Sequence, residues 1–426
     1  MMRSMYSGVS GLRIHQTKMD VIGNNIANVN TAGFKSSRVT FSEVFSQTIQ
    51  GASGSSQNKG GTNPMQIGLG ASISSIDIDM TEGAAQRTDN PLDLKIEGDG
   101  FFVVSDVTGN KFTRAGAFRI DQAGNLVSPE GLNLMGWYPD PTSGDIIKSK
   151  ASPLQILNAE NSYVKPEFTQ NMTLSGNIDK NDPQLAPAKG GVPLEITFYD
   201  NLGYKYSANF TVTSTGTDGE FDFTLDSVTS SDTGLPVAGA ALGASTLEFD
   251  ITTGLLTNPA SIDITGLTDA FADPITIDPT GITMFSGNST IGGAAGDKNG
   301  LNAGRAPGAI SGFEVGSDGK ILGRYSNGET KLLGQIIIAK FQNPAGLQKI
   351  GSNLFVTTSN SGDFDGIGED ITSSGGSLNA GVLEMSNVDL SREFTEMITT
   401  QRGFQANSRI ITSSDEMLQE LVNLKR

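Results

Sequence analysis

The two ends of this chain carry matching amphipathic segments, and these constrain the fold more than any other feature. Alternating spacings of four and three residues mark one stripe in the first segment: Met5, Val9, Leu12, Gln16, Met19, Gly23, Ile26 and Asn30. The last segment repeats the spacing with Leu390, Phe394, Met397, Gln401, Phe404, Ser408, Ile411, Asp415, Leu418 and Val422. This spacing puts side chains on one helix face, so we expect a helix at each end. Asp389 or Asn387 can cap the second helix.

Each of these helices has more apolar surface than one partner helix can cover. Outside the stripes lie Ile14, Val21, Ile22, Val29, Ile398, Ile410, Leu421 and Leu424. An amphipathic helix ordinarily packs on its own domain core, and packing supplies most of its stability. The sequence contains no third long amphipathic segment. We therefore expect the two helices to pair in a coiled-coil-like manner and to find their remaining neighbours in other copies of the chain.

Between the ends, the sequence changes to the alternating pattern of β-strands. Residues 51–63 form a polar, glycine-rich loop. Residues 118–127 and 313–322 both read as hairpins and share the pattern Phe-x-[Ile/Val]-x3-Gly-x-[Leu/Ile]. Hairpins share turn chemistry, so the match can be coincidental. It is also what a single β domain interrupted by a long insertion would give.

The insertion has its own alternation, which is typical of strands with one wet face. Its apolar positions are Leu194, Ile196, Phe198, Tyr206, Ala208, Phe210, Val212, Phe221, Phe223, Leu225, Leu247, Phe249 and Ile251. This pattern predicts an antiparallel β-sandwich or barrel. The fold class is therefore mainly β with α-helical termini, in a nested arrangement. We expect a terminal helical domain (1–30 plus 386–426), a connecting segment (31–75 plus 375–385), a split β domain (76–162 plus 306–374) and an inserted outer β domain (163–305).

Charge and composition exclude several classes of protein. The 426 residues carry a formal charge of −17 and no cysteine, so disulfides and thiolate metal sites are excluded. The negative charge lies in the middle, because residues 1–45 carry five Lys/Arg against two Asp/Glu. An acidic middle argues against binding nucleic acid or an anionic membrane. No segment has the length and apolar character of a membrane span or a cleavable signal peptide. The chain is thus either cytoplasmic or exported without a cleaved signal.

The sequence offers no catalytic constellation, cofactor motif or metal site. His15 has no second histidine or cysteine nearby, so we interpret it as a polar helix position. Residues 363–370 (DFDGIGED) resemble a calcium loop, but Ile367 stands where an EF-hand needs Asp or Asn. Trp137 can be read as a sugar-stacking platform, although local packing is the better interpretation. We expect no enzymatic activity.

Several segments resemble one family, the axial rod and hook proteins of the bacterial flagellum. Residues 24–35, NNIANVNTAGFK, are similar to its N-terminal signature through Asn24, Asn25, Asn28, Asn30, Gly33, Phe34 and Lys35. Residues 386–426 are similar to its C-terminal segment. GDGFFVV (98–104) and residues 113–131 and 333–355 resemble its β domain. Hook-type members are favoured over rod-type ones because the chain has a large central β insertion, in which residues 199–212 also resemble the hook-type outer domain.

The resemblance implies a structural subunit of the flagellar hook, extracellular and exported by the flagellar export apparatus without a cleaved signal. Many copies would polymerise into a flexible curved tube that transmits torque from the motor rod to the filament. Other implied partners are the distal rod protein, the hook cap and the hook–filament junction protein. The terminal helices would line the tube through their apolar stripe residues: Met5, Val9, Leu12, Met19, Ile26, Leu390, Phe394, Met397, Phe404, Ile411, Leu418 and Val422.

The asparagine-rich motif has a physical interpretation in such a tube. Amides at the end of the first helix can satisfy polar neighbours in a tightly packed wall. Gly33 then supports a turn after the helix, and Lys35 places a cation near the helix C-terminus. Two alternatives stay open: a distal rod or other axial protein, and an exported carbohydrate-binding β protein.

Overall fold

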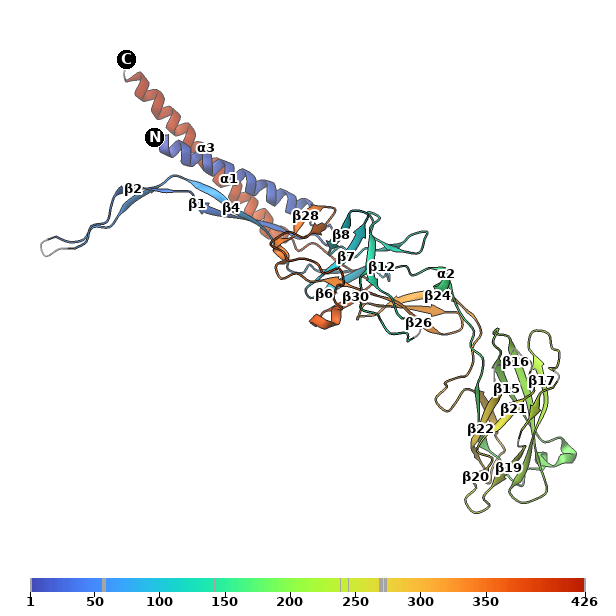
Figure 1. The fold of residues 1–426 in the computed structure, drawn as a ribbon. Helices are drawn as coiled ribbons and strands as arrows, with labels where there is room; N and C mark the ends of the chain where they lie inside the picture. The colour runs from blue at the N-terminus through green and yellow to red at the C-terminus, as the bar shows by residue number, and fades with distance from the viewer. Residues whose placement is uncertain are drawn as a thin grey trace. The chain divides into compact units, whose positions relative to one another are not determined.

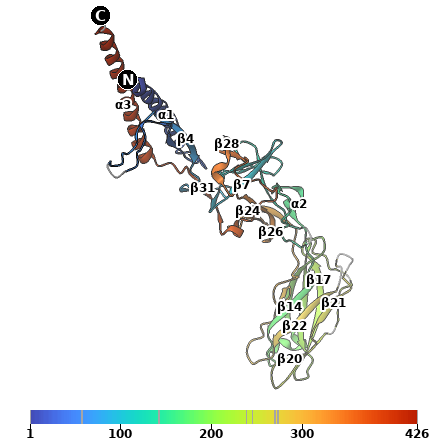
Figure 2. The same cartoon turned by 60° about the vertical axis from the view of Figure 1, so that its left-hand side comes forward.

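The computed structural model describes residues 2–55, 59–140, 143–237, 239–243, 245–267, 271 and 274–424. Figures 1 and 2 show helices at both termini and strands between them. The chain forms two compact units. Unit 1 comprises Met1–Asn158, Phe313–Leu322 and Leu332–Arg426, and unit 2 comprises Ala159–Gly312 and Gly323–Lys331.

Two long helices lie side by side in unit 1, α1 (Met2–Ala27) and α3 (Leu390–Asn423) (Figure 1). They run antiparallel, because Gly8 lies against Ile411 while His15 lies against Gly403. The Asp389 side chain accepts hydrogen bonds from two amides of the first turn of α3 and is its cap. The expected helix at each end is therefore confirmed, as is their pairing.

Short antiparallel strand pairs join separate parts of the chain in unit 1. β1 (Ser37–Glu43) pairs with β4 (Ala71–Ile78), and β2 (Ser46–Gln50) pairs with β3 (Met65–Gly68). β5 (Ala85–Arg87) pairs with β31 (Val382–Glu384), and β6 (Leu94–Glu97) pairs with β30 (Ser377–Ala380). The last two pairs bring residues near the start and the end of the chain together.

The largest sheet of unit 1 supplies its hydrophobic core. Its main strands are β11 (Asn133–Trp137), β7 (Phe101–Asp106), β8 (Gly109–Thr113), β29 (Leu354–Val356) and β28 (Gln348–Gly351), in that order. β9 (Arg119–Ile120), β10 (Leu126–Val127), β12 (Ser152–Pro153) and β27 (Ile338–Ala339) extend it. Phe101, Val103, Phe112, Ile337 and Phe355 are central members of the core. β9 and β10 form the hairpin expected at 118–127.

Three further strands contain residues of both units: β24 (Gly308–Val315), β25 (Lys320–Tyr325) and β26 (Thr330–Ile336). β24 and β25 are neighbours in the sheet, which confirms the second expected hairpin at 313–322. The short elements are α2 (Ala159–Ser162), β13 (Tyr163–Val164) and the 3-10 turns Pro183–Leu185, Pro187–Lys189, Pro344–Gly346 and Ile371–Ser374.

Unit 2 contains two five-stranded sheets that share one core (Figure 2). One sheet has the order β18 (Ala241–Leu242), β21 (Ile262–Thr265), β22 (Ile275–Thr283), β14 (Asn171–Asn177), β23 (Gly292–Ala295). The other has the order β15 (Val192–Tyr199), β16 (Lys205–Ser214), β17 (Glu220–Ser230), β19 (Thr246–Phe249), β20 (Leu256–Asn258). Apolar residues of both sheets form one buried cluster, as the predicted sandwich requires.

Two details of the sandwich differ from the expectation. β14 and β22 pair in parallel, which is possible because the long chain between them allows a crossover. Ile251 is 61% exposed, since β19 ends at Phe249 and Ile251 falls in the following turn. The other alternating positions are buried, apart from the partly buried Tyr206 and Leu225.

Two candidate ligand sites of the sequence have structural roles instead. Trp137 is buried, and its Nε1 donates to the carbonyl oxygens of Ser149 and Ile367, so it is not a sugar platform. In residues 363–370, Asp365 accepts from the amides of Ile367 and Gly368, and Asp370 caps a 3-10 turn. These carboxylates stabilise local turns.

Replacing Phe210 with Ala is expected to destabilise the sandwich by about 3–5 kcal/mol, because its fully buried ring leaves a cavity. The ring stacks on Phe223 with centroids 4.8 Å apart. Urea unfolding followed by amide hydrogen exchange within residues 171–283 measures the loss. Ile251→Ala is the control, with an expected change within about 0.5 kcal/mol. Equal losses in the two variants would contradict the assigned core.

Candidate assembly surface and the junction of the chain ends

The contact between α1 and α3 is made largely by small and polar residues, which we call the helix seam. It comprises Gly8, Gly11, His15, Lys18 and Asn25 of α1, with Glu393, Glu396, Gly403, Asn407 and Ile411 of α3. Lys18 Nζ lies 3.2 Å from Glu396 Oε2, and Asn25 Nδ2 donates to Glu393 Oε1 at 3.1 Å. The glycines let the helices approach closely, so few large apolar side chains are used in this contact.

The apolar stripes lie beside the helix seam, which shares Ile411 with them, and several of their side chains stay exposed. Val9 follows Gly8, and Phe394 follows Glu393; one residue is a rotation of about 100° around a helix. Val9 is 46% exposed, Phe394 49%, Leu390 38% and Val422 68%. The remaining stripe residues are half-buried: Met5, Leu12, Met19, Ile26, Met397, Phe404, Ile411 and Leu418. Pairing within one chain therefore leaves part of each stripe exposed.

The asparagines at the end of α1 have partners in the same chain. Asn25 is buried, and its amide donates to the Ser37 carbonyl oxygen at 2.9 Å and accepts from the Ser37 amide at 3.0 Å. The Asn28 side chain donates to the backbone oxygen and side-chain oxygen of Asn24. Asn30 is exposed. The side chain of Asn25 is thus engaged within the chain, where its hydrogen bonds hold β1 and α3 against α1.

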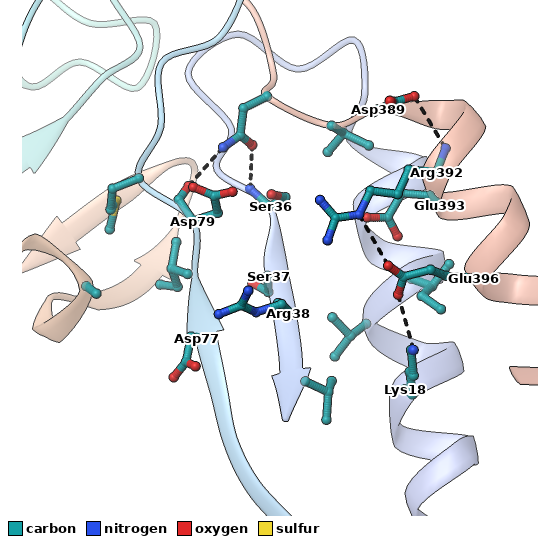
Figure 3. Close-up of a pocket in the computed structure, with 18 of the residues that line it drawn as sticks. Lys18, Ser36, Ser37, Arg38, Asp77, Asp79, Asp389, Arg392, Glu393 and Glu396 are labelled. Carbon is teal, nitrogen blue, oxygen red and sulfur yellow. Dashed lines mark hydrogen bonds and ion pairs between the residues drawn. The ribbon is translucent and has the colours of Figure 1, made fainter. Parts of the chain in front are cut away.

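A cavity of about 430 Å³ lies between α1, β1, β4, residues 343–345 and the start of α3 (Figure 3). Glu396 on its wall is shared by Lys18 and Arg392, whose Nε lies 3.3 Å away. Burial tends to raise the pKa of Glu396, but these two cations outweigh it and hold the pKa below its usual value. Burial raises the pKa of neighbouring Glu393. At the wall of this cavity, the ion pair between Lys18 and Glu396 joins α1 to α3.

A buried ion pair joins the N-terminal motif to the C-terminal part of the chain. Lys35 Nζ lies 2.6 Å from Glu384 Oε1, and both side chains are at most 1% exposed. Lys35 also donates to the Thr81 carbonyl oxygen at 2.7 Å, and the Gly83 amide donates to Glu384 Oε1 at 3.0 Å. Arg114 Nη1 lies 3.5 Å from Glu384 Oε2. We call these three charged residues, Lys35, Arg114 and Glu384, the terminal junction.

Lys35, which we expected to place a cation near the C-terminus of the first helix, belongs to this buried ion pair. Its ammonium is used to neutralise a carboxylate that is itself fully buried, and an unpaired buried charge is strongly unfavourable. Burial lowers the pKa of Lys35, while Glu384 opposes this shift. Nothing in the sequence pointed to Glu384, because a single Glu far along the chain carries no pattern.

Gly33 and Phe34 complete the attachment of the motif. Gly33 has φ of 69°, its amide donates to the Glu384 carbonyl oxygen at 2.8 Å, and a Cβ there would lie 2.5 Å from the Ala115 nitrogen. Phe34 is buried, with Lys349 Nζ 4.2 Å from its ring centroid. Asn353 Nδ2 donates to the Ala32 carbonyl oxygen at 2.9 Å. The motif is therefore held by residues of three distant segments.

The side chains at the start of α3 also attach it to the N-terminal strands. Asn387, one of the two candidate caps, instead accepts from the Ser36 amide at 2.8 Å and donates to the Asp79 carbonyl oxygen at 2.9 Å. Among the described residues, no group of three or more His, Cys, Asp or Glu is placed to hold a metal ion. No helix in the described part of the chain is long and apolar enough to cross a membrane.

Lys35→Ala is expected to destabilise unit 1 by about 3–5 kcal/mol, because it leaves the Glu384 carboxylate buried without its cation. The double variant Lys35→Met with Glu384→Leu removes both charges and is expected to lose less. Lys320→Ala, which breaks a more exposed pair with Asp318, should cost about 1 kcal/mol or less. Urea unfolding monitored by Trp137 fluorescence measures all three. A Lys35→Ala loss no larger than that of Lys320→Ala would refute the junction's role.

Gly33→Ala is expected to destabilise the chain more than Gly131→Ala. Both glycines have positive φ, but a Cβ at Gly131 meets no atom within 4 Å, whereas at Gly33 it meets the backbone of Arg114 and Ala115. Both variants place a non-glycine residue at positive φ, which costs about 1–3 kcal/mol of backbone strain. Gly33→Ala adds a steric clash to this strain. Thermal unfolding of the two variants gives the comparison. If the two midpoints fall equally, the close approach at Gly33 is not important.

The chain matches three family descriptions at the segments just described. "Flagella basal body rod protein" matches residues 5–35, which contain most of α1 and the motif around Lys35. "Flagellar hook protein FlgE/F/G D1 domain" matches residues 95–178. "Flagellar basal body rod FlgEFG protein C-terminal" matches residues 379–424, which contain Glu384 and α3.

Full-length relatives agree with these matches. The flagellar hook protein FlgE of Borreliella burgdorferi is 38% identical, and that of Treponema pallidum is 36% identical, each over 100% of both chains. The flagellar basal-body rod protein FlgG of Bacillus subtilis is 33% identical over 100% of both chains. The structure has a terminal pair of helices and a β unit closed by the terminal junction, and these relatives are 33–38% identical over the whole length of the chain. The chain therefore belongs to the flagellar hook protein family.

Proposed function

We propose that this structural subunit of the flagellar hook polymerises with identical copies through its two apolar stripes. The observation that supports the proposal is the division of each terminal helix into two faces. The helix seam uses mainly glycine and polar residues within one chain, and part of each stripe stays exposed beside it, with large side chains such as Phe394 and Val422.

Burial of the stripes supplies a driving force for assembly. Fully burying a Val, Leu, Ile or Phe side chain is worth about 1.5–3 kcal/mol relative to leaving it exposed. Several such residues lie along each helix, so contacts with neighbouring copies can outweigh the entropy lost on association. The polymer is a flexible curved tube that acts as a universal joint and transmits torque from the motor rod to the filament.

The rest of the proposal follows the nested organisation of the chain. Residues 1–30 and 386–426 line the tube, residues 31–75 and 375–385 connect the layers, residues 76–162 with 306–374 form a middle layer, and residues 163–305 form the outer one. The subunit is extracellular, is exported without a cleaved signal, and is not an enzyme. Its further partners are the distal rod protein, the hook cap, the hook–filament junction protein and the export apparatus.

A rod subunit is the second candidate, because one full-length relative is named a basal-body rod protein. The two functions differ in the shape of the polymer. Electron microscopy of the assembled protein distinguishes them, since a curved tube supports the hook and a straight one supports the rod.

The double variant Val9→Ser with Phe394→Ser is expected to reduce tube formation at least about tenfold, because it removes apolar contacts worth more than about 1.4 kcal/mol. The lone chain should unfold at nearly the same urea concentration, since both side chains are about half exposed there. Sedimentation of polymer and electron microscopy measure the yield. Ile147→Ser, which replaces an equally exposed apolar residue outside the helices, is the control. Wild-type yield in the double variant would exclude these stripe residues as contacts.

A further inference from the structure

Two glycine-walled notches lie in the helix seam, one on each helix. In the first, Asn407 of α3 lies against Gly8 and Gly11 of α1. A Cβ at Gly11 would lie 2.6 Å from Asn407 Nδ2 and 2.7 Å from Asn407 Cγ, closer than real Cβ contacts allow. A Cβ at Gly8 would lie 3.3 Å from Ile411 Cγ1. Asn407 thus occupies space that only glycine leaves free.

The second notch is the reverse arrangement, one helical turn away. His15 of α1 lies against Gly403 of α3, and a Cβ at Gly403 would be 2.7 Å from both Cε1 and Nε2 of the imidazole. His15 Nδ1 is buried and has no hydrogen-bond partner among the described residues. Burial and the nearby charge of Lys18 lower the pKa of His15, which favours the neutral ring. The imidazole is therefore seated by shape rather than by a hydrogen bond.

We propose that His15 and Asn407 are positioning residues that fix the register of α1 against α3 and thereby set which side chains the helix pair presents to other copies. This proposal rests on the proposed assembly through the apolar stripes. A slide of one turn, about 5.4 Å, would move each seated side chain from its notch onto other positions of the facing helix. Because one side chain comes from each helix, the two notches restrict sliding and rotation of both.

Fixing this register has a direct effect on the stripes. Val9, Leu12 and Phe404 each follow a glycine of the notches by one residue. A helix rotated so that an apolar residue replaced a glycine in the seam would bury part of the stripe within the chain and remove it from the surface available to other copies. The notches therefore act on assembly through the stripes and not by contacting another copy.

The first test compares glycine substitutions in the lone chain, kept too dilute to polymerise. Alanine is the better helix former, so Gly→Ala at an unobstructed helix position is expected to stabilise the helix or leave it unchanged. Gly23 is such a position, since a Cβ there meets no atom within 4 Å. Gly403→Ala and Gly11→Ala should instead lower the melting midpoint of the helical circular dichroism by roughly 2–4 °C. If they behave like Gly23→Ala, there are no notches and the proposal fails.

The second test is complementation, which a loss of helix propensity cannot mimic. Truncating the seated side chain makes room for the new methyl group, so His15→Ala should restore the midpoint lowered by Gly403→Ala. Asn407→Ala should likewise restore that of Gly11→Ala. If the losses of melting midpoint in the two single variants simply add in either double variant, the proposed fit between the seated side chain and the glycine is overturned.

The third test measures the register itself and links it to assembly. The chain has no cysteine, so cysteines introduced at the exposed positions Arg13 and Gln405 are unique sites for nitroxide labels. A single interlabel distance is expected in the wild-type background, a shifted or broadened distribution in Gly403→Ala, and recovery in the double variant with His15→Ala. Tube yield should fall and recover with the distance. If the interlabel distance does not change in Gly403→Ala, the proposed role of the notches in fixing the register is overturned, while the proposed role of the stripes in assembly is not. If the distance shifts but the tube yield stays at the wild-type level, the proposed link between register and assembly is overturned.

Discussion

The buried ion pair between Lys35 and Glu384 is the interaction on which the rest of unit 1 depends. It joins the segment after α1 to the strand before α3, and Arg114 links both to the central sheet. Charged groups this deeply buried are tolerated only when paired and hydrogen-bonded, and Thr81 and Gly83 supply the additional hydrogen bonds. Because the pair forms only when both segments are in place, the end of α1 and the start of α3 are held close together, and the two helices can lie side by side.

The two faces of the helix pair follow from the same arrangement. Because the end of α1 lies near the start of α3, the helices pair antiparallel, and the glycines of the helix seam allow this pair to form with few large apolar side chains. Ordinary paired helices bury their apolar stripes against each other, which leaves little to attract a third helix. Here the stripes remain on the flank. A chain built in this way is folded at its ends and still able to bind identical copies.

Periodicity was enough to predict the helices, the hairpins and the sandwich, because each depends on local spacing of apolar residues. Periodicity did not identify the helix seam. The apolar pattern in α1 follows the stripe Met5–Val9–Leu12, and the glycines and His15 beside this stripe form no apolar pattern of their own. The terminal junction could not be predicted, since Lys35 and Glu384 are 349 residues apart and sequence spacing carries no information on such a pair. Ile251 was misplaced because the alternation continued past the end of β19 into a turn.

The pairing of β6 with β30 joins residues 94–97 to residues 377–380, which are separated by about two thirds of the chain. Without residues 377–384, β6 has no edge partner and Lys35 has no buried carboxylate beside it. Closure of unit 1 therefore depends on segments from both halves of the polypeptide, and neither half can close it alone.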